Sequence, residues 1–358
     1  MKDILFCTLF LLLFSCNNKK ENSKIKLNQI QVIGSHNSYK KPIDTALFEF
    51  LKSKDSTNKL QSLEYAHIPI PEQLNMGVRN LEIDVYSDTL GGKYAHPKGL
   101  DLISTHSEYD VKGEMKKPGF KVFHVLDIDF NSHYFTLESC LKDIKEWSDT
   151  NPFHYPVFIT LEAKDGETGI PGTEPESFTT RLFDKLDTQI IQRLGKDKLI
   201  IPDDVRDNFS TLEEAVLNNN WPSLEDAKGK FLFILDNAGR KKDLYTQNHP
   251  SLKNRVMFVN SPEGTPEAAA MIINNPLDER IPELIKKGYL IRTRADAGTK
   301  EARENDYSRF EAAKKSGAQI ITTDYYKSSS FFNSTYHISF KDSTYVRNNP
   351  VNYPSVKK

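Results

Sequence analysis

The sequence predicts an α/β protein and, within that class, a (β/α)8 TIM-type barrel. Short apolar runs that end in polar residues occur eight times along the chain, and amphipathic helical patterns separate several of them. Strands that alternate with helices favour a parallel sheet, and eight such units suffice to close a barrel. A length of 358 residues accommodates one large barrel with additions.

The predicted strands are the apolar runs at residues 30–37, 78–86, 121–127, 156–164, 230–237, 255–260, 289–296 and 318–325. Helical periodicity marks residues 135–148, 175–194 and 301–317, and Gly317 is placed to cap the last helix. Two segments, 87–120 and 195–229, are additions to the eight strand–helix units, and we expect both at the barrel mouth. The run "KLII" at 198–201 is an alternative ninth strand.

The N-terminus has the pattern of a bacterial export signal. Lys2 precedes an apolar run from Ile4 to Phe14, which is too short to span a bilayer, and a polar tract follows. The sequence "LLFSC" resembles a lipobox, in which Cys16 becomes the lipid-carrying first residue; an ordinary cleaved signal, giving a secreted protein, is the alternative. We therefore expect a signal at 1–16, a tether at 17–28, the barrel at 29–328, a C-terminal extension at 329–358, and a location in the cell envelope.

Composition excludes several classes of partner and site. The 48 basic and 49 acidic residues leave no basic excess, so nucleic acid is not an expected partner. Cys140 is the only cysteine beyond the predicted signal, which excludes an internal disulfide and a zinc site built from several thiolates. We expect Cys140 to pack on a helix and the protein to be a monomer.

Polar side chains concentrate at the ends of the predicted strands. In a barrel of this type, residues at the C-terminal ends of the strands form the active site. The residues in these positions are His36 and Asn37, Glu82 and Asp84, His124 and Asp127, Glu162 and Lys164, and Arg294 and Asp296.

The spacing of the acidic residues indicates a metal site. Alternate residues of a strand share a face, so Glu82 and Asp84 point the same way, as do Glu162 and Lys164. Two carboxylates on one strand, a third from two strands away and the amide oxygen of Asn37 form a hard-oxygen set suited to Ca²⁺, with Mg²⁺ as the alternative. Three carboxylates facing one mouth would repel each other without a shared cation.

Five ordered motifs extend this interpretation. "GSHNSY", "LEIDVYSD", "FHVLDIDF", "PVFITLEAK" and "IRTRAD" resemble the catalytic-barrel motifs of calcium-dependent phosphatidylinositol-specific phospholipases C, in particular the single-domain bacterial lineage. The resemblance covers roughly residues 29–328. It implies a phosphoric diester hydrolase that acts on phosphatidylinositol, or a related inositol phosphodiester, at a membrane surface.

The resemblance also implies roles for individual positions. It places the calcium ligands at Asn37, Glu82, Asp84 and Glu162, the two catalytic histidines at His36 and His124, and an inositol contact at Arg294. Lys164 shares a face with Glu162 and is positioned to meet the phosphate.

The expected reaction begins with attack of the inositol 2-hydroxyl on the adjacent phosphorus. We assign stabilisation of the phosphorane to His36 and protonation of the leaving oxygen to His124, because histidine titrates near neutrality. Either Glu82 or Glu162 would take the hydroxyl proton.

The sequence also bears on the choice of substrate, and it leaves two alternative functions open. Eukaryotic members carry lysines at the fifth strand, where this chain ends in Asp236, which favours an unphosphorylated inositol ring; Arg240, Lys241 and Lys242 just beyond weaken that inference. A glycerophosphodiester phosphodiesterase on the same barrel and a non-catalytic lipid-binding surface lipoprotein are the alternatives.

Overall fold

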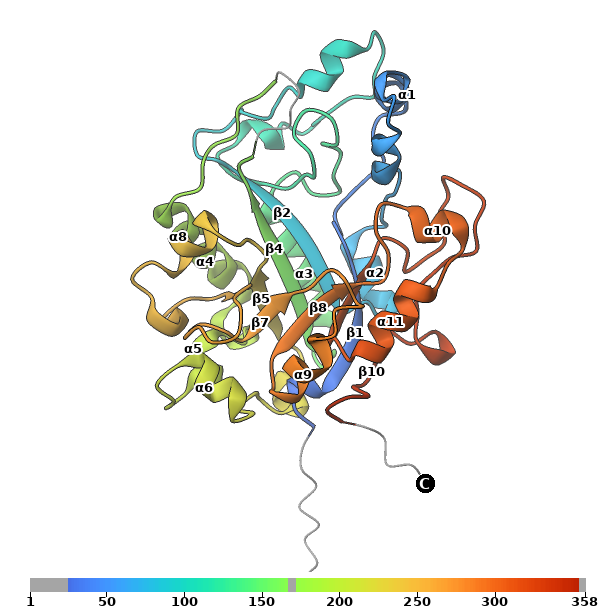
Figure 1. Ribbon diagram of the computed structural model, residues 1–358. Helices are drawn as coiled ribbons and strands as arrows, with labels where there is room; N and C mark the ends of the chain where they lie inside the picture. Colours follow the sequence, from blue (N-terminus) through green and yellow to red (C-terminus); the bar gives the residue numbers. More distant parts are fainter. Residues whose placement is uncertain (1–24, 167–171, 354–358) are drawn as a thin grey trace, which may run out of the picture.

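Eight parallel strands form the wall of a nearly closed barrel in the computed structural model, which describes residues 25–166 and 172–353 (Figure 1). The predicted fold class is therefore confirmed. The barrel strands are β1 (Ile30–Ser35), β2 (Asn80–Asp88), β4 (Val157–Lys164), β5 (Phe231–Leu235), β6 (Phe258–Val259), β7 (Ala270–Ile272), β8 (Leu290–Arg294) and β9 (Ile320–Thr323). Their spatial order is β6-β5-β4-β2-β1-β9-β8-β7.

The two ends of this order meet at a seam between β6 and β7. An isolated parallel bridge between Asn260 and Ala270 joins the two strands. The Asn260 side chain adds to it, since its Oδ1 accepts a hydrogen bond from the Ile272 amide at 3.1 Å and its Nδ2 donates to the Asp236 carbonyl at 3.0 Å. The Ser261 amide also donates to the Ala270 carbonyl at 3.2 Å, so one backbone bridge and one side chain close the barrel there.

The helices of the described residues are α1 (Thr45–Lys54), α2 (Ile70–Met76), α3 (Leu137–Thr150), α4 (Thr180–Leu194), α5 (Pro202–Arg206), α6 (Leu212–Leu217), α7 (Leu224–Ala227), α8 (Arg240–Thr246), α9 (Ile281–Lys286), α10 (Lys300–Glu304) and α11 (Ser308–Ser316). Most of them lie around the outside of the barrel, whereas α1 lies at its mouth and packs against Leu100, Ile128 and Phe130 (Figure 1). Within residues 25–166 and 172–353, none of them has the length and apolar character needed to cross a bilayer.

The three helical patterns in the sequence correspond to four of these helices. The patterns at 135–148 and 175–194 correspond to α3 and α4, and Cys140 is fully buried on α3 as expected. The third pattern contains two helices, α10 and α11, because Asn305 adopts a left-handed conformation with φ of 53° and ends the first. Gly317 caps α11 with φ of 83°, as predicted.

One predicted strand is wrong and one real strand was missed. Residues 121–127 do not form a barrel strand: β3 (Gly119–Lys121) pairs antiparallel with the end of β2, and the chain then continues as a loop. The missed strand is β7. Because β4 pairs directly with β2, Glu162 lies on the neighbouring strand rather than two strands away.

The two long insertions lie at opposite ends of the barrel, which corrects the expectation that both decorate the mouth. Residues 89–118 follow the C-terminal end of β2 and form the turquoise segment at the top of Figure 1. Ser223, in the 195–229 segment, instead bridges Lys26 just before β1, at the N-terminal end of the barrel. The run at 198–201 is not a ninth strand, because only Leu199 bridges β5, at Phe231.

The described chain packs on the barrel at both of its ends. Leu27 and Asn28, in the segment predicted as a tether, are buried. In the predicted C-terminal extension, β10 (Val346–Asn348) pairs antiparallel with β1, and Tyr336 and Ile338 are fully buried. The predicted signal and Cys16 lie outside the described residues.

Close packing of β1 against β2 brings the two halves of the site together. Gly34 pairs with Asn80, and a Cβ on Gly34 would lie only 2.4 Å from the Asn80 Cβ. The Asn80 side chain continues across the sheet and donates to the Thr160 hydroxyl at 3.1 Å. The residues that follow β1 therefore lie beside the polar residues of β2 and β4.

Candidate active site

Three carboxylates on two neighbouring strands form an acidic cluster at the mouth of the barrel. Asp84 on β2 is in register with Glu162 on β4, and Glu82 lies two residues before Asp84 on the same face of β2. One ligand oxygen from each of Glu82, Asp84 and Glu162 lies within 4.8 Å of the others. Glu82 and Asp84 are buried, whereas Glu162 is partly exposed.

The acidic cluster fits a divalent cation. Both carboxylate oxygens of Asp84 are buried without a hydrogen-bond partner, and the Lys164 ammonium lies 3.5 Å from one of them and 3.3 Å from Glu162. Burial raises the pKa of Asp84 to about 7, Lys164 opposes this, and Glu162 adds to it. Carboxylates gathered in this way, with lone pairs left unused, match the oxygen donors that Ca²⁺ prefers.

The loop after β1 carries Asn37 to the side of this cluster. Asn37 turns the chain with φ of 50°, a conformation that asparagine tolerates well. The next residue, Ser38, donates its amide to the Glu82 carbonyl at 2.9 Å and accepts from the Glu82 amide through its Oγ at 2.8 Å. The Asn37 Nδ2 donates to the Tyr65 hydroxyl, and its Oδ1 accepts a long hydrogen bond of 3.3 Å from Tyr39.

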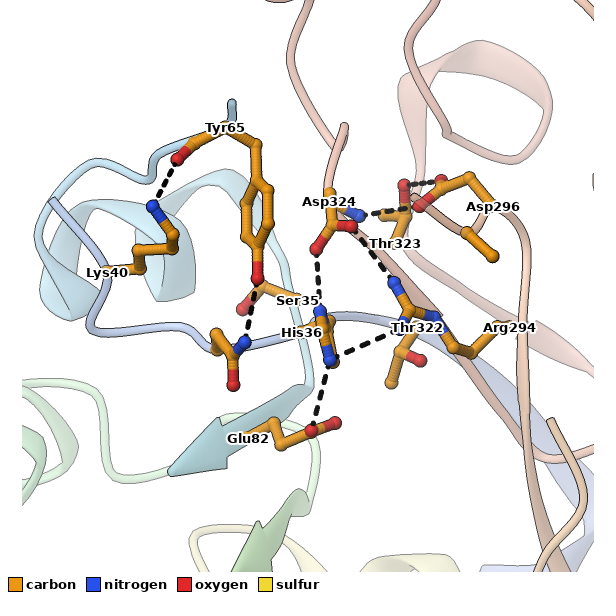
Figure 2. Close-up of polar contacts among 12 residues, drawn as sticks. Ser35, His36, Lys40, Tyr65, Glu82, Arg294, Asp296, Thr322, Thr323 and Asp324 are labelled. Atoms are coloured by element: carbon orange, nitrogen blue, oxygen red, sulfur yellow. Dashed lines mark hydrogen bonds and ion pairs between the residues drawn. The ribbon is translucent and has the colours of Figure 1, made fainter. Parts of the chain in front are cut away.

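His36 lies between a carboxylate, an arginine and the acidic cluster (Figure 2). Its Nδ1 is 2.8 Å from the Asp324 Oδ1, and its Nε2 is 3.5 Å from the Glu82 Oε1 and 3.2 Å from the Arg294 Nη1. Arg294 also donates to the other oxygen of Asp324 at 2.9 Å. Burial lowers the pKa of His36, Arg294 lowers it further, and the two carboxylates oppose this. The Nε2 atom therefore faces the cluster.

His124 has a similar partner although it comes from a loop. Its Nδ1 lies 2.7 Å from the Asp129 Oδ2, and its side chain is 16% exposed. The Tyr86 hydroxyl donates to the His124 carbonyl at 3.1 Å and fixes the backbone. The charge of His124 lowers the pKa of Asp84. Each histidine thus keeps Nδ1 on a carboxylate, and the Nε2 of His36 lies beside Arg294 and Glu82.

Comparison with known proteins decides the family. A family model described as "Phosphoinositide phospholipase C, Ca2+-dependent" matches residues 25–350. The chain belongs to this family of phosphodiesterases. No curated protein matches the chain.

Solved structures agree with this phospholipase C family at the level of the fold. A calcium-dependent phosphoinositol-specific phospholipase C from Pseudomonas sp is 16% identical with a TM-score of 0.54, over 91% of this chain and 96% of that one. A Ca²⁺-dependent phosphatidylinositol-specific phospholipase C from Streptomyces antibioticus is 20% identical with a TM-score of 0.53, over 84% and 95%.

This phospholipase C chain contains site residues that the sequence analysis did not single out. Arg292, which is 2% exposed, forms an ion pair with Glu82. It could have been predicted, because it lies two residues before Arg294 on β8 and so shares its face of the strand. Asp324 directly follows β9, where the strand-end rule applies. Asp129 offered no such signal because its loop has no periodicity; Asp127 instead accepts hydrogen bonds from the backbone of Lys98 and Thr173.

Proposed function

We propose that this chain cleaves phosphatidylinositol to diacylglycerol and an inositol phosphate, with the residue roles given below. The observation that carries these roles is the acidic cluster with the unpartnered Asp84 oxygens, beside two histidines that each rest on a carboxylate. Asn37, Glu82, Asp84 and Glu162 would hold the Ca²⁺ on which the family depends. When bound, this ion lowers the pKa of the attacking hydroxyl and neutralises charge on the phosphoryl oxygens.

The reaction is an attack of the inositol 2-hydroxyl on the adjacent phosphorus, which makes the nucleophile intramolecular. Glu162 takes the hydroxyl proton, because Glu82 is held by Arg292 whereas the Glu162 side chain is 33% exposed. The anionic phosphate favours the imidazolium form of His36, and its Nε2–H donates a hydrogen bond to the phosphorane as the new P–O bond forms. The bond to the glycerol oxygen then breaks, and that oxygen takes the Nε2 proton of the His124 imidazolium, which leaves the ring neutral.

Lys164 and Arg294 orient the substrate. The Lys164 side chain is 24% exposed beside Asp84 and Glu162, where its ammonium meets a phosphoryl oxygen. Arg294 presents a planar guanidinium beside His36 and binds hydroxyl groups of the inositol ring.

The inositol ring of the substrate carries no further phosphate. Asp236, at the end of β5, is close enough to the acidic cluster for Glu82 and Glu162 to add to the effect of burial, which raises its pKa to about 7 while Arg292 opposes it. An added ring phosphate would meet this acidic wall. The three basic residues just beyond are already paired: Arg240 and Lys241 with Asp165, and Lys242 with Glu267.

The mouth of the barrel faces a membrane surface. The segment 89–118, at the mouth end of β2, exposes large apolar side chains: Leu90 is 90% exposed and Val111 is 77% exposed. Apolar side chains at this edge suit contact with the acyl region of a bilayer. The protein acts there as a monomer.

We also propose that the protein is a lipoprotein of the bacterial cell envelope, anchored through Cys16. The support is the apolar run and "LLFSC" sequence at the N-terminus. Cys16→Ser should release the protein from the membrane fraction, and unchanged membrane association of that variant would contradict the anchor.

The experiment that tests the activity incubates the purified mature protein with phosphatidylinositol vesicles and with glycerophosphodiesters, each with calcium and with a chelator. We expect release of diacylglycerol from phosphatidylinositol only when calcium is present. Turnover of the glycerophosphodiesters alone, or hydrolysis of phosphatidylinositol that survives chelation, would overturn the proposal.

A further inference from the structure

Lys40 is a lysine whose charge is completely removed from solvent. Its side chain is fully buried, and its ammonium lies 3.2 Å from the Asp129 Oδ1 and donates to the carbonyl oxygens of Tyr65 at 2.9 Å and Lys41 at 3.4 Å. Figure 2 shows the contact with Tyr65. A buried ammonium requires such compensation, because desolvation of an unpaired charge is very costly. Asp129, itself fully buried, is its counter-ion.

The backbone places Lys40 where the loops that carry the two histidines meet. Lys40 forms an antiparallel bridge with Ser132, and the Lys41 amide donates to the Asn131 carbonyl at 3.2 Å. The first of these segments follows His36, and the second follows His124 and Asp129. The Lys40 ammonium also lies 4.8 Å from the centre of the Tyr65 ring. Lys40 therefore joins the two loops from a position fully removed from solvent.

Asp129 connects Lys40 to His124. One carboxylate oxygen meets the Lys40 ammonium, and the other lies 2.7 Å from the His124 Nδ1. Burial alone would raise the pKa of Asp129, but the Lys40 charge and then the His124 ring outweigh it, so this pKa lies below its ordinary value. A carboxylate that stays ionised accepts from Nδ1–H and orients the ring with Nε2 outward.

We propose that Lys40 is a positioning residue for the reaction: through the Asp129 carboxylate it holds the His124 ring with Nδ1–H on Asp129, so that the Nε2–H of the imidazolium delivers its proton to the leaving oxygen and leaves the neutral Nδ1–H tautomer. The inference rests on the proposed role of His124 as the acid. It adds a fully buried residue that acts on His124 through Asp129.

Lys121 provides a matched control. It is also fully buried, its ammonium lies 3.8 Å from the Asp88 carboxylate, and it donates to the carbonyl of Glu114 at 3.2 Å. Its described contacts include no histidine and no residue of the acidic cluster. Substitution of Lys40 removes a buried charge that is linked to His124, and substitution of Lys121 removes a buried charge that has no such link. Comparing the two separates the loss of the link from the loss of a buried charge.

The test measures kcat on two substrates for Lys40→Met, Lys121→Met and His124→Ala. The diacylglycerol oxygen of phosphatidylinositol is a poor leaving group that must be protonated by an acid. The 4-nitrophenolate of an inositol 4-nitrophenyl phosphodiester leaves without protonation. Because general acid catalysis is worth about 10²- to 10⁴-fold, we expect Lys40→Met to lower kcat on phosphatidylinositol at least about tenfold and to affect the nitrophenyl ester far less. Lys121→Met should leave the ratio of the two rates unchanged.

The double variant Lys40→Met/His124→Ala should show little loss beyond that of His124→Ala, since both changes remove the same acid. Equal losses of Lys40→Met on both substrates, or an additive loss in the double variant, would overturn the role of Lys40. If His124→Ala itself affects both substrates equally, the proposed role of His124 fails, and nitrogen NMR of the His124 ring decides whether Lys40 positions it. A tautomer shift in Lys40→Met that is absent in Lys121→Met supports positioning, and identical spectra refute it.

A second pair of variants covers a failure of Lys40→Met to fold. Lys40→Met/Asp129→Asn removes both buried charges and is compared with Asp129→Asn alone. If Lys40 acts only through Asp129, the two variants share one ratio of rates on the two substrates. A further change of that ratio in the double variant would contradict the proposal.

Discussion

At the scale of single residues, the site pairs each histidine with a carboxylate, and the two pairs differ in how far apart their members lie in the sequence. His36 and Asp324 are 288 positions apart, so no local pattern connects them. His124 and Asp129 are five positions apart, but they face each other across a loop without periodicity. His36 and Asp324 each follow a barrel strand, so the strand-end rule reaches both, although it does not pair them. His124 and Asp129 lie in a loop, where no strand period applies.

Glu162→Gln tests the acidic cluster at this scale. The amide keeps the shape of the side chain but removes one negative charge from the set that would bind Ca²⁺. We expect the calcium concentration for half-maximal stabilisation to rise about tenfold or more, which corresponds to about 1.4 kcal/mol of binding free energy. A calcium titration of the melting temperature measures this independently of the role of Glu162 as the base, with the exposed Glu304→Gln as control. Unchanged calcium dependence would remove Glu162 from the metal site.

Asp84→Asn separates stability from metal binding. The Asp84 carboxylate is buried among other carboxylates, with unpartnered oxygens. Removing its charge should leave the melting temperature of the calcium-free protein unchanged or raise it, by roughly 1 kcal/mol in unfolding free energy. The rise that calcium causes in the wild-type protein should disappear. Thermal unfolding with calcium and with chelator checks both; a less stable variant that still responds to calcium would contradict them.

At the scale of elements, the strand pattern predicted the count of eight but not every member. The run at 121–127 is apolar like a buried strand, yet its chain bends and turns, with φ of 66° at Asp127. Its Phe123 and Leu126 are buried against Tyr94 and Met115 of the mouth insertion, and apolar character alone does not distinguish such a loop from a strand. The missed strand β7 is three residues long and follows Ala268 and Ala269, residues that local propensity assigns to helices. Only its pairing with β8 makes it a strand.

Gly34→Ala tests the contact between β1 and β2. The added Cβ would lie 2.4 Å from the Asn80 Cβ, an atom that no side-chain rotation can move. Overpacking of this kind costs about 1–3 kcal/mol or more, and the shift of β1 also displaces the loop that carries His36. Denaturant unfolding and activity should both fall. Gly166→Ala, where no atom lies within 4 Å of the added Cβ, is the control and should change neither.

At the scale of the whole molecule, the family and the overall architecture were within reach of the sequence because they depend on many weak signals that agree. The positions of the insertions were not. Residues 195–229 lie at the N-terminal end because Leu27 and Ser223 anchor them beside the start of β1, a contact that joins distant parts of the chain. Long-range pairing of this kind has no local signature in the residues involved.

Because only one bridge joins β6 to β7, the barrel is a curved sheet whose two edge strands are weakly connected. From Asn80 with Phe158 to Tyr86 with Lys164, β2 and β4 pair along their length, whereas the seam has a single bridge, between Asn260 and Ala270, with a hydrogen bond from the Ser261 amide beside it. Local opening should therefore begin there, so the backbone amide of Ile272 should exchange with deuterium faster than those of β2 and β4.

Asn260→Ala removes the acceptor of the Ile272 amide, which should accelerate exchange on both sides of the seam while β2 keeps its protection. Mass spectrometry of peptic fragments resolves the two regions, and uniform exchange around the barrel would contradict this expectation. The wall of the barrel thus has a built-in order of opening, in which the strands that bear the acidic cluster are the last to separate.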